Sequence, residues 1–412
     1  MTSSLTSSGK KIAIIGGGAA GFFAAINCKT NYPDYQVDIL EKSNKTLSKV
    51  KVSGGGRCNV THNCMDIAKL MKFYPRGGKQ LKKAFYQFNP THTVDWFKTR
   101  GVELKTESDN RMFPITDQSH TIINCFQDEV DKLGIEVKLG CSVSSLNTEG
   151  IRFNICINDE NHLYDHVIIA AGGNSKIQGF DWLKKLGHEI KPPVPSLFTF
   201  NMPNEHTANL MGVVAPEAKV KVQGTKIQQE GPLLFTHWGM SGPAILKTSA
   251  WGARTLSEMN YEFSISVNWT GLENEELIRN ALQKTKVQQH KKKIANANPF
   301  ESVTNRLWSY ILKRATIDET TIWAECPKKL LNKLVNGLFN DVYEVKGKTT
   351  FKEEFVTCGG VALSGVNMKT MESKSCPGLY FAGEVLDIDG VTGGFNFQAA
   401  WSTGFVAAKL QQ

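Results

Sequence analysis

The sequence predicts an α/β protein in which one nucleotide-binding domain is interrupted by an inserted β-rich part and an inserted helical part. Three observations lead to this prediction. First, an apolar segment at 11–15, a glycine cluster, a helix of small residues and a second apolar segment at 36–40 form a βαβ opening. Second, strand-like and then helix-like segments fill the middle of the chain. Third, a strand and glycine-rich turns return after residue 354 and lead into a final helix.

Length and composition are those of a folded protein with two or three domains. The chain has 412 residues, of which 41% are hydrophobic and 21% charged, and a domain averages about 150 residues. No apolar run approaches the ~20 residues of a membrane-spanning helix, and the N-terminus lacks an apolar signal core. Nine cysteines without a Cys-x-x-Cys pair argue against a disulfide framework and a zinc site. We therefore expect a soluble, cytoplasmic protein with reduced thiols and no metal.

The net charge suits anionic ligands without identifying one. Lys and Arg number 48 against 39 Asp and Glu, which gives a formal net charge of +9, and the densest basic run is at 290–293. A solvated basic surface is the commoner explanation of such an excess, so it is favoured over nucleic-acid binding. We expect a small-molecule substrate and no membrane association, and the oligomeric state stays open.

The elements of the first part follow from periodicity and from helix-breaking residues. Residues 1–9 form a polar tail that we expect to be disordered. Amphipathic helices are expected over 80–100 and 119–133, and the second ends at Gly134. Strands are expected at 135–139, around Val143, at 151–157 and at 166–171. Three prolines within 192–195 end this part, because proline cannot continue a helix or an interior strand.

The middle of the chain changes from strands to helices. Strand-like segments lie at 196–200, 218–222, 231–236 and 261–267, and helix-like segments follow at 272–283, 302–315 and 327–339. The expected organisation is a nucleotide-binding domain over 10–194 and 346–412, an inserted β-rich domain over 195–270 and an inserted helical subdomain over 271–345.

Residues 16–21 contain the pattern Gly-x-Gly-x-x-Gly directly after the first strand and at the start of a helix. In this pattern Gly16 permits a tight turn, Gly18 lets a pyrophosphate approach the backbone, and Gly21 lets the helix pack closely on the strand. The helix N-terminus offers free N–H groups and a positive dipole end to phosphates. Glu41 would accept hydrogen bonds from the ribose hydroxyls and repel a 2′-phosphate. We therefore predict a Rossmann-like site for a dinucleotide that ends in plain adenosine.

The C-terminal segment indicates that the dinucleotide is FAD. An apolar strand leads into Gly383 and Glu384, and Gly393 and Gly394 follow just before a small-residue helix. Flavoproteins of the two-part FAD fold use such a returning strand, because its terminal acid holds the ribityl chain and the helix N-terminus faces the flavin. A helix dipole at that place would stabilise negative charge on reduced flavin. The strand that ends at 171–173 is similar to the middle glycine turn of this fold, with an ordinary strand-ending turn as the alternative.

A second glycine-rich loop, 53–59, follows the ribose acid. Its glycines can present backbone N–H groups to an anion, and Arg57 can neutralise a phosphate, so cofactor contact is favoured over a bare surface turn. Cys58 and Cys64 suggest a redox dithiol, but five residues separate them where the flavoprotein disulfide reductases have four. The chain also lacks a second Gly-x-Gly-x-x-Gly pattern for a separate NADH domain. A packed or cofactor-lining Cys58 is therefore favoured over a catalytic one.

Taken together, these motifs resemble the BaiN-like family of NAD(P)/FAD-dependent oxidoreductases, a group that includes aminoacetone oxidases. The matching segments are 16–21, 53–61, 111–114, 234–243 and 370–394, and they span most of the chain. His62 departs from the asparagine that the family pattern leads us to expect. The resemblance implies an FAD domain interrupted by β-rich and helical inserts. The residues placed at the cofactor are Gly16, Gly18, Ala19, Ala20, Gly21, Glu41, Lys42, Gly55, Gly56, Arg57, Cys58, Asn59, Val143, Ala171, Gly172, Gly383, Glu384, Gly393, Gly394, Phe395 and Asn396.

The predicted function is FAD-dependent oxidoreduction. We expect a hydride to move between flavin N5 and either a small organic substrate or NAD(P)H, which would dock transiently without a fold of its own. His237, at the end of an apolar strand in the insert, is the candidate acid or base, although a structural role is favoured for it. The alternatives are a small-amine oxidase that uses oxygen, an RNA-acting flavoprotein and a non-catalytic FAD-binding module. One continuous basic face and steeply salt-dependent affinity would favour the RNA-acting alternative.

Overall fold

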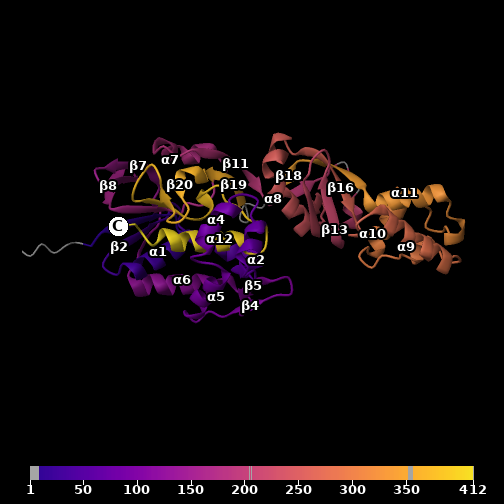
Figure 1. Ribbon diagram of the computed structural model, residues 1–412, viewed down its shortest axis with the longest axis horizontal. Helices are drawn as coiled ribbons and strands as arrows, with labels where there is room; N and C mark the ends of the chain where they lie inside the picture. Colours follow the sequence, from indigo (N-terminus) through magenta and orange to yellow (C-terminus); the bar gives the residue numbers. More distant parts are fainter. Residues whose placement is uncertain (1–8, 204, 206, 351–355, 412) are drawn as a thin grey trace, which may run out of the picture. The chain divides into compact units, whose positions relative to one another are not determined.

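The computed structural model describes residues 9–203, 205, 207–350 and 356–411 (Figure 1). The chain forms two compact units, of which unit 1 comprises Met1–Pro195 and Lys352–Gln412 and unit 2 comprises Ser196–Phe351. The tail that we expected to be disordered lies outside the described residues, apart from Gly9. None of the helices formed by the described residues has both the length and the hydropathy that crossing a bilayer requires.

A parallel sheet forms the centre of unit 1. Its parallel strands lie in the order β22-β10-β1-β2-β6, and two short antiparallel strands, β21 and β20, extend it beyond β22. The apolar runs of β1 and β10 are buried on both faces of this sheet, because other elements cover each face. The bounds are β1 (Lys11–Ile15), β2 (Gln36–Leu40), β6 (Glu136–Lys138), β10 (His166–Ile169), β20 (Val366–Asn367), β21 (Glu372–Ser373) and β22 (Leu379–Phe381).

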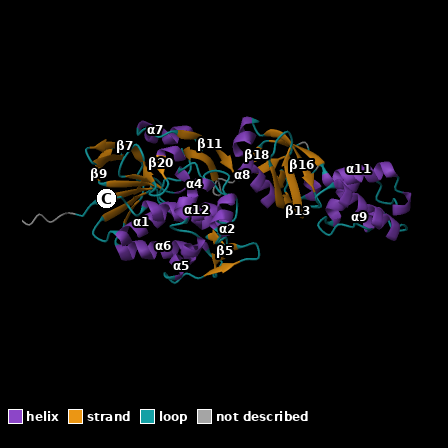
Figure 2. Ribbon diagram, in the orientation of Figure 1, coloured by secondary structure: helices purple, strands orange, loops and turns teal. Residues whose placement is uncertain are grey.

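Helices and a small antiparallel sheet cover the parallel sheet of unit 1 (Figure 2). Helices α1 (Ala19–Asn31), α6 (Ser119–Leu133) and α12 (Phe395–Ala407) form the helical layer, in which α1 contacts both of the others. Strands β7 (Val143–Glu149), β8 (Arg152–Ile157) and β9 (Glu160–Tyr164) form the small sheet, which contacts β1 and β10. Helix α6 has the predicted bounds and ends at Gly134 in the left-handed conformation.

The region between β2 and α6 carries short elements: α2 (Ser48–Gly56), β3 (Thr61–His62), α3 (Ile67–Leu70), η1 (Met71–Phe73), α4 (Gly78–Phe85), α5 (Pro90–Lys98), β4 (Leu104–Thr106) and β5 (Arg111–Pro114). The prediction of one helix over 80–100 is wrong, because two helices occupy this range. Asn89 caps α5 through hydrogen bonds to the N–H groups of Thr91 and His92, and Pro90 occupies its first turn. The chain therefore starts a new helix at Asn89.

The proline-rich segment forms a strand, β11 (Ile190–Ser196), whose partner among the described strands is β19 (Val356–Val361). Proline lacks the N–H group that a central strand needs for hydrogen bonds on both sides. The prolines are tolerated in β11 because a strand of a two-stranded sheet is an edge strand. The short helices of this part are η2 (Ile177–Phe180), α7 (Asp181–Lys185), η6 (Leu363–Gly365) and η7 (Gly383–Val385).

An antiparallel sheet forms the centre of unit 2, in the order β17-β16-β13-β14-β15-β12-β18. Helix α8 (Pro243–Glu258) packs on β13 and β14, and α11 (Lys328–Phe339) packs on β16 and β17. The strands are β12 (Thr199–Asn201), β13 (Val214–Val222), β14 (Gln228–Phe235), β15 (Gly239–Ser241), β16 (Glu262–Asn268), β17 (Asp341–Lys346) and β18 (Lys348–Thr349). The remaining helices are η3 (Ala208–Leu210), α9 (Glu275–Gln288), η4 (Ile294–Asn296), α10 (Asn305–Arg314) and η5 (Trp323–Glu325).

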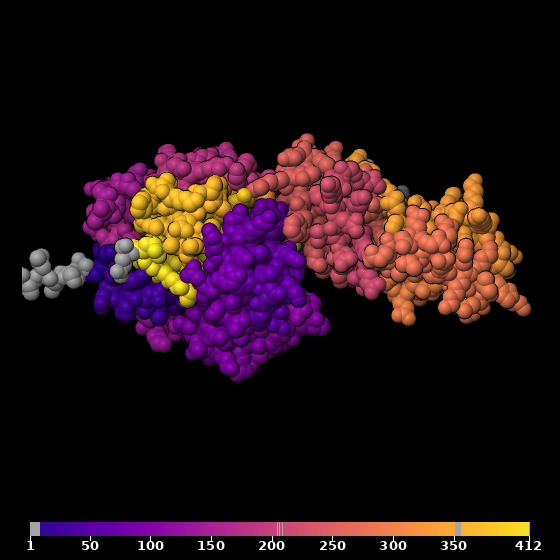
Figure 3. Space-filling model, viewed as in Figure 1, coloured from indigo at the N-terminus to yellow at the C-terminus, as the bar shows by residue number. Residues whose placement is uncertain are grey.

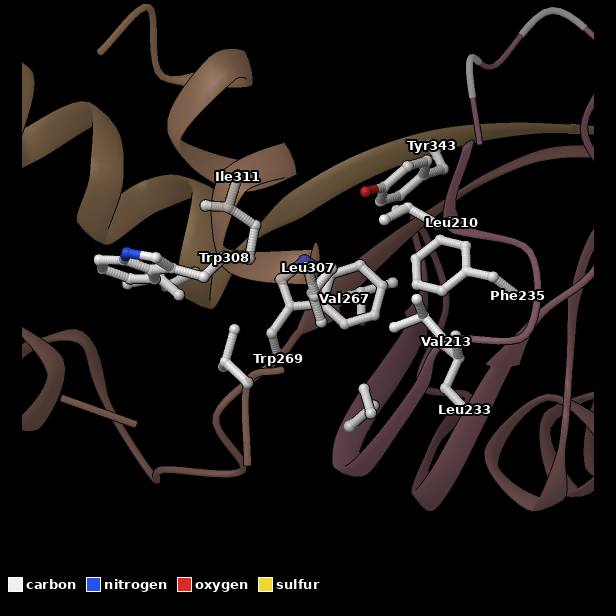
Figure 4. Packing of buried hydrophobic residues seen from close by; sticks show 14 of the residues in the cluster. Leu210, Val213, Leu233, Phe235, Val267, Trp269, Leu307, Trp308, Ile311 and Tyr343 are labelled. Carbon is white, nitrogen blue, oxygen red and sulfur yellow. The ribbon is translucent and has the colours of Figure 1, made fainter. Parts of the chain in front are cut away.

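The β-rich and helical parts of the insertion share one hydrophobic core. Trp308 of α10 belongs to the same cluster of buried side chains as Val267 of β16, Trp269 and Tyr343 (Figure 4). Strands β17 and β18 follow the helices in sequence but complete the sheet, so the chain returns to unit 1 at Lys352 and not at the expected residue 346. The expected β-rich domain and helical subdomain therefore form one unit.

Candidate functional site

The strand order of unit 1 reverses between β1 and β10. The chain leaves β1 through α1 and reaches β2 on one side, whereas β10 and β22 lie on the other side. Open α/β sheets bind ligands at the carboxyl ends of the strands at such a point. The two turns that follow these strands, 16–18 and 170–173, are both segments that the sequence places at the cofactor. The topology therefore brings them to one edge of the sheet.

The three motif glycines have different surroundings. Gly16 has a φ of +115°, and a Cβ there would lie 2.4 Å from the carbonyl oxygen of Ala170. A Cβ at Gly21 would lie 1.9 Å from the carbonyl oxygen of Gly16, so both positions are closed by protein. At Gly18 a Cβ would meet no atom within 4 Å among the described residues. Only this glycine borders open space, and it is the residue that precedes α1.

Helix α1 supplies no anion for its own N-terminus. Gly18 makes no side-chain capping hydrogen bond, and the first turn, which includes Ala19 and Ala20, has no acidic residue. The first N–H groups of a helix need acceptors from outside the helix. A phosphate placed against Gly18 would supply these acceptors and would interact favourably with the helix dipole.

Glu41 lies against the glycine turn. Its Oε2 accepts a hydrogen bond from the N–H of Gly17 at 2.7 Å, and its Oε1 accepts one from the N–H of Ser43 at 2.8 Å. These bonds fix the carboxylate beside the turn, and each oxygen keeps a lone pair for another donor. Lys42 is exposed next to it, and Val143 is the half-buried first residue of β7. Glu41 is thus oriented so that it can still accept hydrogen bonds from a ribose.

The loop 53–59 is a kinked continuation of α2. Gly54, Gly55 and Gly56 have φ of +59°, +70° and +84°, and a Cβ on Gly55 or Gly56 would meet no described atom within 4 Å. The side chain of Arg57 turns away to an ion pair with Glu107 at 2.6 Å, and this hydrogen bond raises its pKa. The guanidinium also lies 4.0 Å from the centre of the Phe113 ring. Arg57 therefore pairs with protein carboxylates in this structure, and its role in neutralising a phosphate stays a prediction.

Cys58 and Asn59 are buried behind this loop. Burial raises the pKa of the Cys58 thiol to about 12, against a smaller opposing effect of its hydrogen bond with Ser53. A protonated thiol is a poor nucleophile, which agrees with a packed role and not with a catalytic one. With its amide nitrogen donating to the Thr61 carbonyl, Asn59 accepts a hydrogen bond from the N–H of Gly394 at 2.9 Å. Asn59 thus connects the loop to the C-terminal glycines.

Glu384 joins three segments that are distant in sequence. Its Oε1 accepts a hydrogen bond from the N–H of Thr357 at 2.8 Å, and its Oε2 forms an ion pair with Lys49 at 2.7 Å. A Cβ on Gly173 would lie 2.8 Å from Oε1, so the turn after β10 passes directly over the carboxylate. Sequence reasoning missed Lys49 and Thr357, since no motif marks either residue.

The opening and closing glycine segments of the chain lie together. A Cβ on Gly383 would lie 2.7 Å from the Cβ of Ala20, in the first turn of α1. The N–H of Gly383 donates to the hydroxyl of Thr403 in α12 at 2.8 Å. Ala171 is exposed and Gly172 half-buried in the turn after β10. The C-terminal strand therefore ends against the helix that opens with the Gly-x-Gly-x-x-Gly motif.

Helix α12 also begins at a glycine turn. Gly393 and Gly394 have φ of +123° and +89°, and the first turn has neither a side-chain cap nor an acidic residue. Asn396 folds back to accept from the N–H of Gly390 at 2.8 Å and to donate to its carbonyl at 3.0 Å. Phe395 stacks on Phe73, with ring centres 4.3 Å apart. These contacts shape the turn that precedes α12.

A segment missed by the sequence analysis, 73–77, runs along this turn. The N–H of Val391 donates to the carbonyl of Phe73 at 2.9 Å, and the hydroxyl of Tyr74 donates to the carbonyl of Phe395 at 2.7 Å. Arg76 forms a bidentate ion pair with Asp389, whose side chain is completely buried. Because these partners lie more than 300 residues apart, sequence spacing gives no signal for them.

His237 lies in unit 2, on the turn between β14 and β15. It is exposed, and its ring packs edge-to-face on Trp238 with ring centres 4.2 Å apart. The indole N–H of Trp238 donates to the hydroxyl of Thr199 at 3.1 Å, which fixes the turn to β12. The catalytic role of His237 stays a prediction.

Known proteins resemble this chain over its whole length. The family model described as HI0933-like protein Rossmann domain matches residues 10–410. The chain is 27% identical over 411 residues to a 3-dehydro-bile acid delta(4,6)-reductase of Clostridium scindens, covering 97% of this chain and 98% of the relative. It is 29% identical over 407 residues to a ribosomal RNA dihydrouridine synthase of Haemophilus influenzae, covering 96% of each.

Solved structures share the fold. A 3-ketosteroid delta1-dehydrogenase from Sterolibacterium denitrificans matches with a TM-score of 0.51 and 11% identity, covering 98% of this chain and 99% of that protein. A flavocytochrome c3 fumarate reductase in an open conformation matches with a TM-score of 0.50 and 15% identity, covering 98% of this chain and 78% of that protein. The predicted fold class, a Rossmann-type FAD-binding domain with an insertion, is confirmed. By its match over residues 10–410, the chain belongs to the HI0933-like family, which confirms the resemblance found in its sequence.

Proposed function

We propose that this protein is an FAD-dependent reductase that delivers a hydride to a carbon–carbon double bond conjugated to a carbonyl group. The observation that carries the proposal is the pair of glycine turns, at 16–18 and 393–394, that open α1 and α12 in one unit. Both helix N-termini lack acidic residues in their first turn and side-chain caps. A carboxylate, Glu41 or Glu384, lies near each end of this arrangement.

The residues present fit FAD in an extended form. Gly18 and the N-terminus of α1 would hold the pyrophosphate, and Glu41 would hold the adenosine ribose. Glu384 would hold the ribityl chain, and the turn at Gly393 and Gly394 would face the isoalloxazine. When bound and reduced by NADH or NADPH, the cofactor would supply a hydride from flavin N5. The positive end of the α12 dipole would stabilise negative charge on the reduced cofactor.

The reaction class is supported by what the two kinds of relative have in common. A 3-dehydro-bile acid delta(4,6)-reductase is named for a steroid with a 3-oxo group and reducible double bonds, and a dihydrouridine synthase is named for a pyrimidine that becomes saturated. In both compounds the double bond is conjugated to a carbonyl. Such a substrate accepts a hydride at the carbon distal to the carbonyl and a proton at the neighbouring carbon. This chain is about equally similar to both relatives, so the proposal rests on the shared chemistry.

The test is an anaerobic absorbance measurement on protein reconstituted with FAD. We expect NADH or NADPH to bleach the flavin band, and a 3-oxo-4,6-diene steroid or a uridine-containing RNA to restore it. Mass spectrometry would then find a product with two additional hydrogen atoms. Bleaching by small amines with recovery only in oxygen would instead identify an amine oxidase. Protein that takes up no FAD, or FAD that no donor reduces, would contradict the proposal.

A further inference from the structure

We propose that a lysine-bearing face of unit 1 docks the phosphate backbone of an RNA substrate beside the flavin end of the site. This inference rests on the proposed function and deepens it by naming the substrate class. We call the surface the lysine face. It consists of the exposed side chains of α3, η1 and α4, namely Lys69, Lys72, Lys79, Lys82 and Lys83.

The segment that carries the lysine face contains basic residues but no acidic ones. Residues 67–94 contain six basic side chains and no Asp or Glu. The nearest preceding acid, Asp66, accepts hydrogen bonds from the N–H groups of Ala68 and Lys69 as the cap of α3. Over the whole chain, by contrast, basic residues exceed acidic ones only by 48 to 39. The segment therefore has a formal charge of +6, as does 277–300 of unit 2, the region that supplies the control variant below.

Helical spacing puts the α4 lysines on one side of the helix. Lys79, Lys82 and Lys83 stand at positions i, i+3 and i+4, and Tyr86 follows at i+7. The Tyr86 side chain is 66% exposed, and Lys82 Nζ lies 5.8 Å from the centre of its ring. Buried residues occupy the opposite side of α4, namely Gly78, Leu81, Ala84 and Phe85. The exposed side thus combines three cations with one aromatic ring.

The lysines of α3 and η1 belong to the same packed substructure. A Cβ on Gly78, the first residue of α4, would lie 2.4 Å from the carbonyl oxygen of Met71 and 3.3 Å from Tyr74 Cβ. Helix α3 contacts both η1 and α4. Lys69 and Lys72 are three residues apart and exposed. All five lysines are therefore carried by one compact group of short helices.

None of these five lysines forms an ion pair with an Asp or Glu among the described residues, in contrast to Lys138, which pairs with Asp38 at 2.8 Å. Like charges three or four residues apart on a helix repel each other. Such an unneutralised surface stabilises a bound polyanion, because binding releases the counterions of the phosphates. The lysine face consequently has the electrostatic character that the RNA-acting alternative requires.

The lysine face is attached directly to the turn that precedes α12. The segment between η1 and α4 contacts that turn through Phe73, Tyr74 and Arg76. A Cβ on Gly77 would lie 2.6 Å from the side chain of Ile388. Figure 3 shows the purple surface of this part of the chain beside the yellow C-terminal segment. An RNA strand held on the lysines would therefore pass close to the flavin end of the site.

The exposed ring of Tyr86 favours RNA over other polyanions. Bases of single-stranded RNA stack on exposed aromatic side chains, and this stacking adds to phosphate contacts. An acidic protein needs no such ring. A membrane-binding helix needs an apolar face that enters the lipid, and the apolar side of α4 is already buried in unit 1. We therefore assign the surface to RNA.

The experiment measures binding of a labelled uridine-rich 20-nucleotide RNA to FAD-loaded protein by fluorescence anisotropy across a salt series. The test variant is Lys79→Glu/Lys82→Glu/Lys83→Glu. The matched control is Lys291→Glu/Lys292→Glu/Lys293→Glu, which makes the same charge change at exposed positions of unit 2. We expect the test variant to raise Kd at least tenfold and the control to change it less than about threefold. The slope of log K against log salt should fall by about 2 in the test variant, at roughly 0.7 per phosphate contact.

A second variant separates stacking from charge. Tyr86→Ala should raise Kd several-fold with an unchanged salt slope, because stacking releases no counterions. Bound-FAD absorbance and a thermal melt check that each variant is folded. Equal RNA affinity of the wild-type protein and the lysine variant would overturn the inference, as would tighter binding of polyglutamate or of vesicles with anionic lipids than of RNA. If the protein does not bind RNA but NADH or NADPH bleaches the flavin and a conjugated ketone restores its absorbance, the RNA inference is wrong and the proposed function is retained. If the protein does not take up FAD, the proposed function itself is contradicted.

Discussion

At the scale of single residues, the three motif glycines of the first turn differ in their surroundings. Two of them are in close contact with backbone atoms, and the third borders open space. Gly16 and Gly21 are closed by backbone oxygens of Ala170 and Gly16, so their missing side chains serve packing. Gly18 faces open space and has an extended backbone that any residue can adopt, with φ of −92° and ψ of −170°. Its missing side chain therefore has no packing role among the described residues, which agrees with the proposed approach of a phosphate to this position.

This difference predicts opposite effects of two substitutions. Gly18→Val should lower the free energy of unfolding by at most about 1 kcal/mol, since valine is a poorer N-cap than glycine. It should raise the Kd for FAD at least tenfold, or about 1.4 kcal/mol, because the valine side chain would occupy the phosphate position. Gly21→Ala should lower the free energy of unfolding by about 1–3 kcal/mol, because its methyl group overlaps the carbonyl of Gly16. Urea unfolding and FAD titration measure the two quantities. Unchanged FAD affinity of the Gly18→Val variant would show that Gly18 is not part of the FAD site.

At the scale of elements, the turn before α12 is held by the segment between η1 and α4. The ion pair between Arg76 and Asp389 is the charged part of this contact, with side chains 11% and 0% exposed. Removing one member of a buried ion pair leaves the other charge without its partner in a low-dielectric environment. The pair therefore joins the turn before α12 to the segment that carries Phe73 and Tyr74.

A double-mutant cycle tests this contact. Asp389→Asn should lower the free energy of unfolding by about 3 kcal/mol, the usual effect of removing one member of a buried pair. Arg76→Met combined with Asp389→Asn should cost less than the sum of the two single substitutions, since no uncompensated charge remains. Urea unfolding of the four proteins gives the coupling energy. Additive effects would show that the two side chains do not stabilise each other.

At the scale of the whole molecule, unit 1 contains three histidines that are shielded from water: His62 in β3 and His166 in β10 are half-buried, and His188 before β11 is buried. Burial lowers the pKa of each ring below the ordinary value of 6.5. Nearby charges act on two of them. Asp109 and Arg111 oppose each other at His62, and Lys10 lowers the pKa of His166 further. Between the folded and unfolded pKa values, the unfolded chain therefore binds more protons than the folded one.

The sign of the resulting pH dependence follows from linkage. Stability should rise with pH through the window just below 6.5, and it should be lost as pH falls through that window, because the unfolded state takes up protons first. Urea midpoints of the protein between pH 7.5 and 5 measure this slope. His188→Gln, which removes one of the three rings and its hydrogen bond with Ser373, should flatten the slope. An equal slope in that variant would show that His188 does not contribute.

The sequence by itself determined the βαβ opening, the Gly-x-Gly-x-x-Gly turn, the span of α6 and the family, because each depends on the spacing of neighbouring residues. It also contained the break between α4 and α5, in Asn89 and Pro90, although the amphipathic pattern over 80–100 concealed it. Only the tertiary structure decided that Lys49 meets Glu384 and that the β-rich and helical inserts share one core. It likewise decided that the segment between α3 and α4 packs on the turn before α12. Periodicity records which side of an element is buried, whereas contacts between distant segments depend on how the layers pack, which no local pattern encodes.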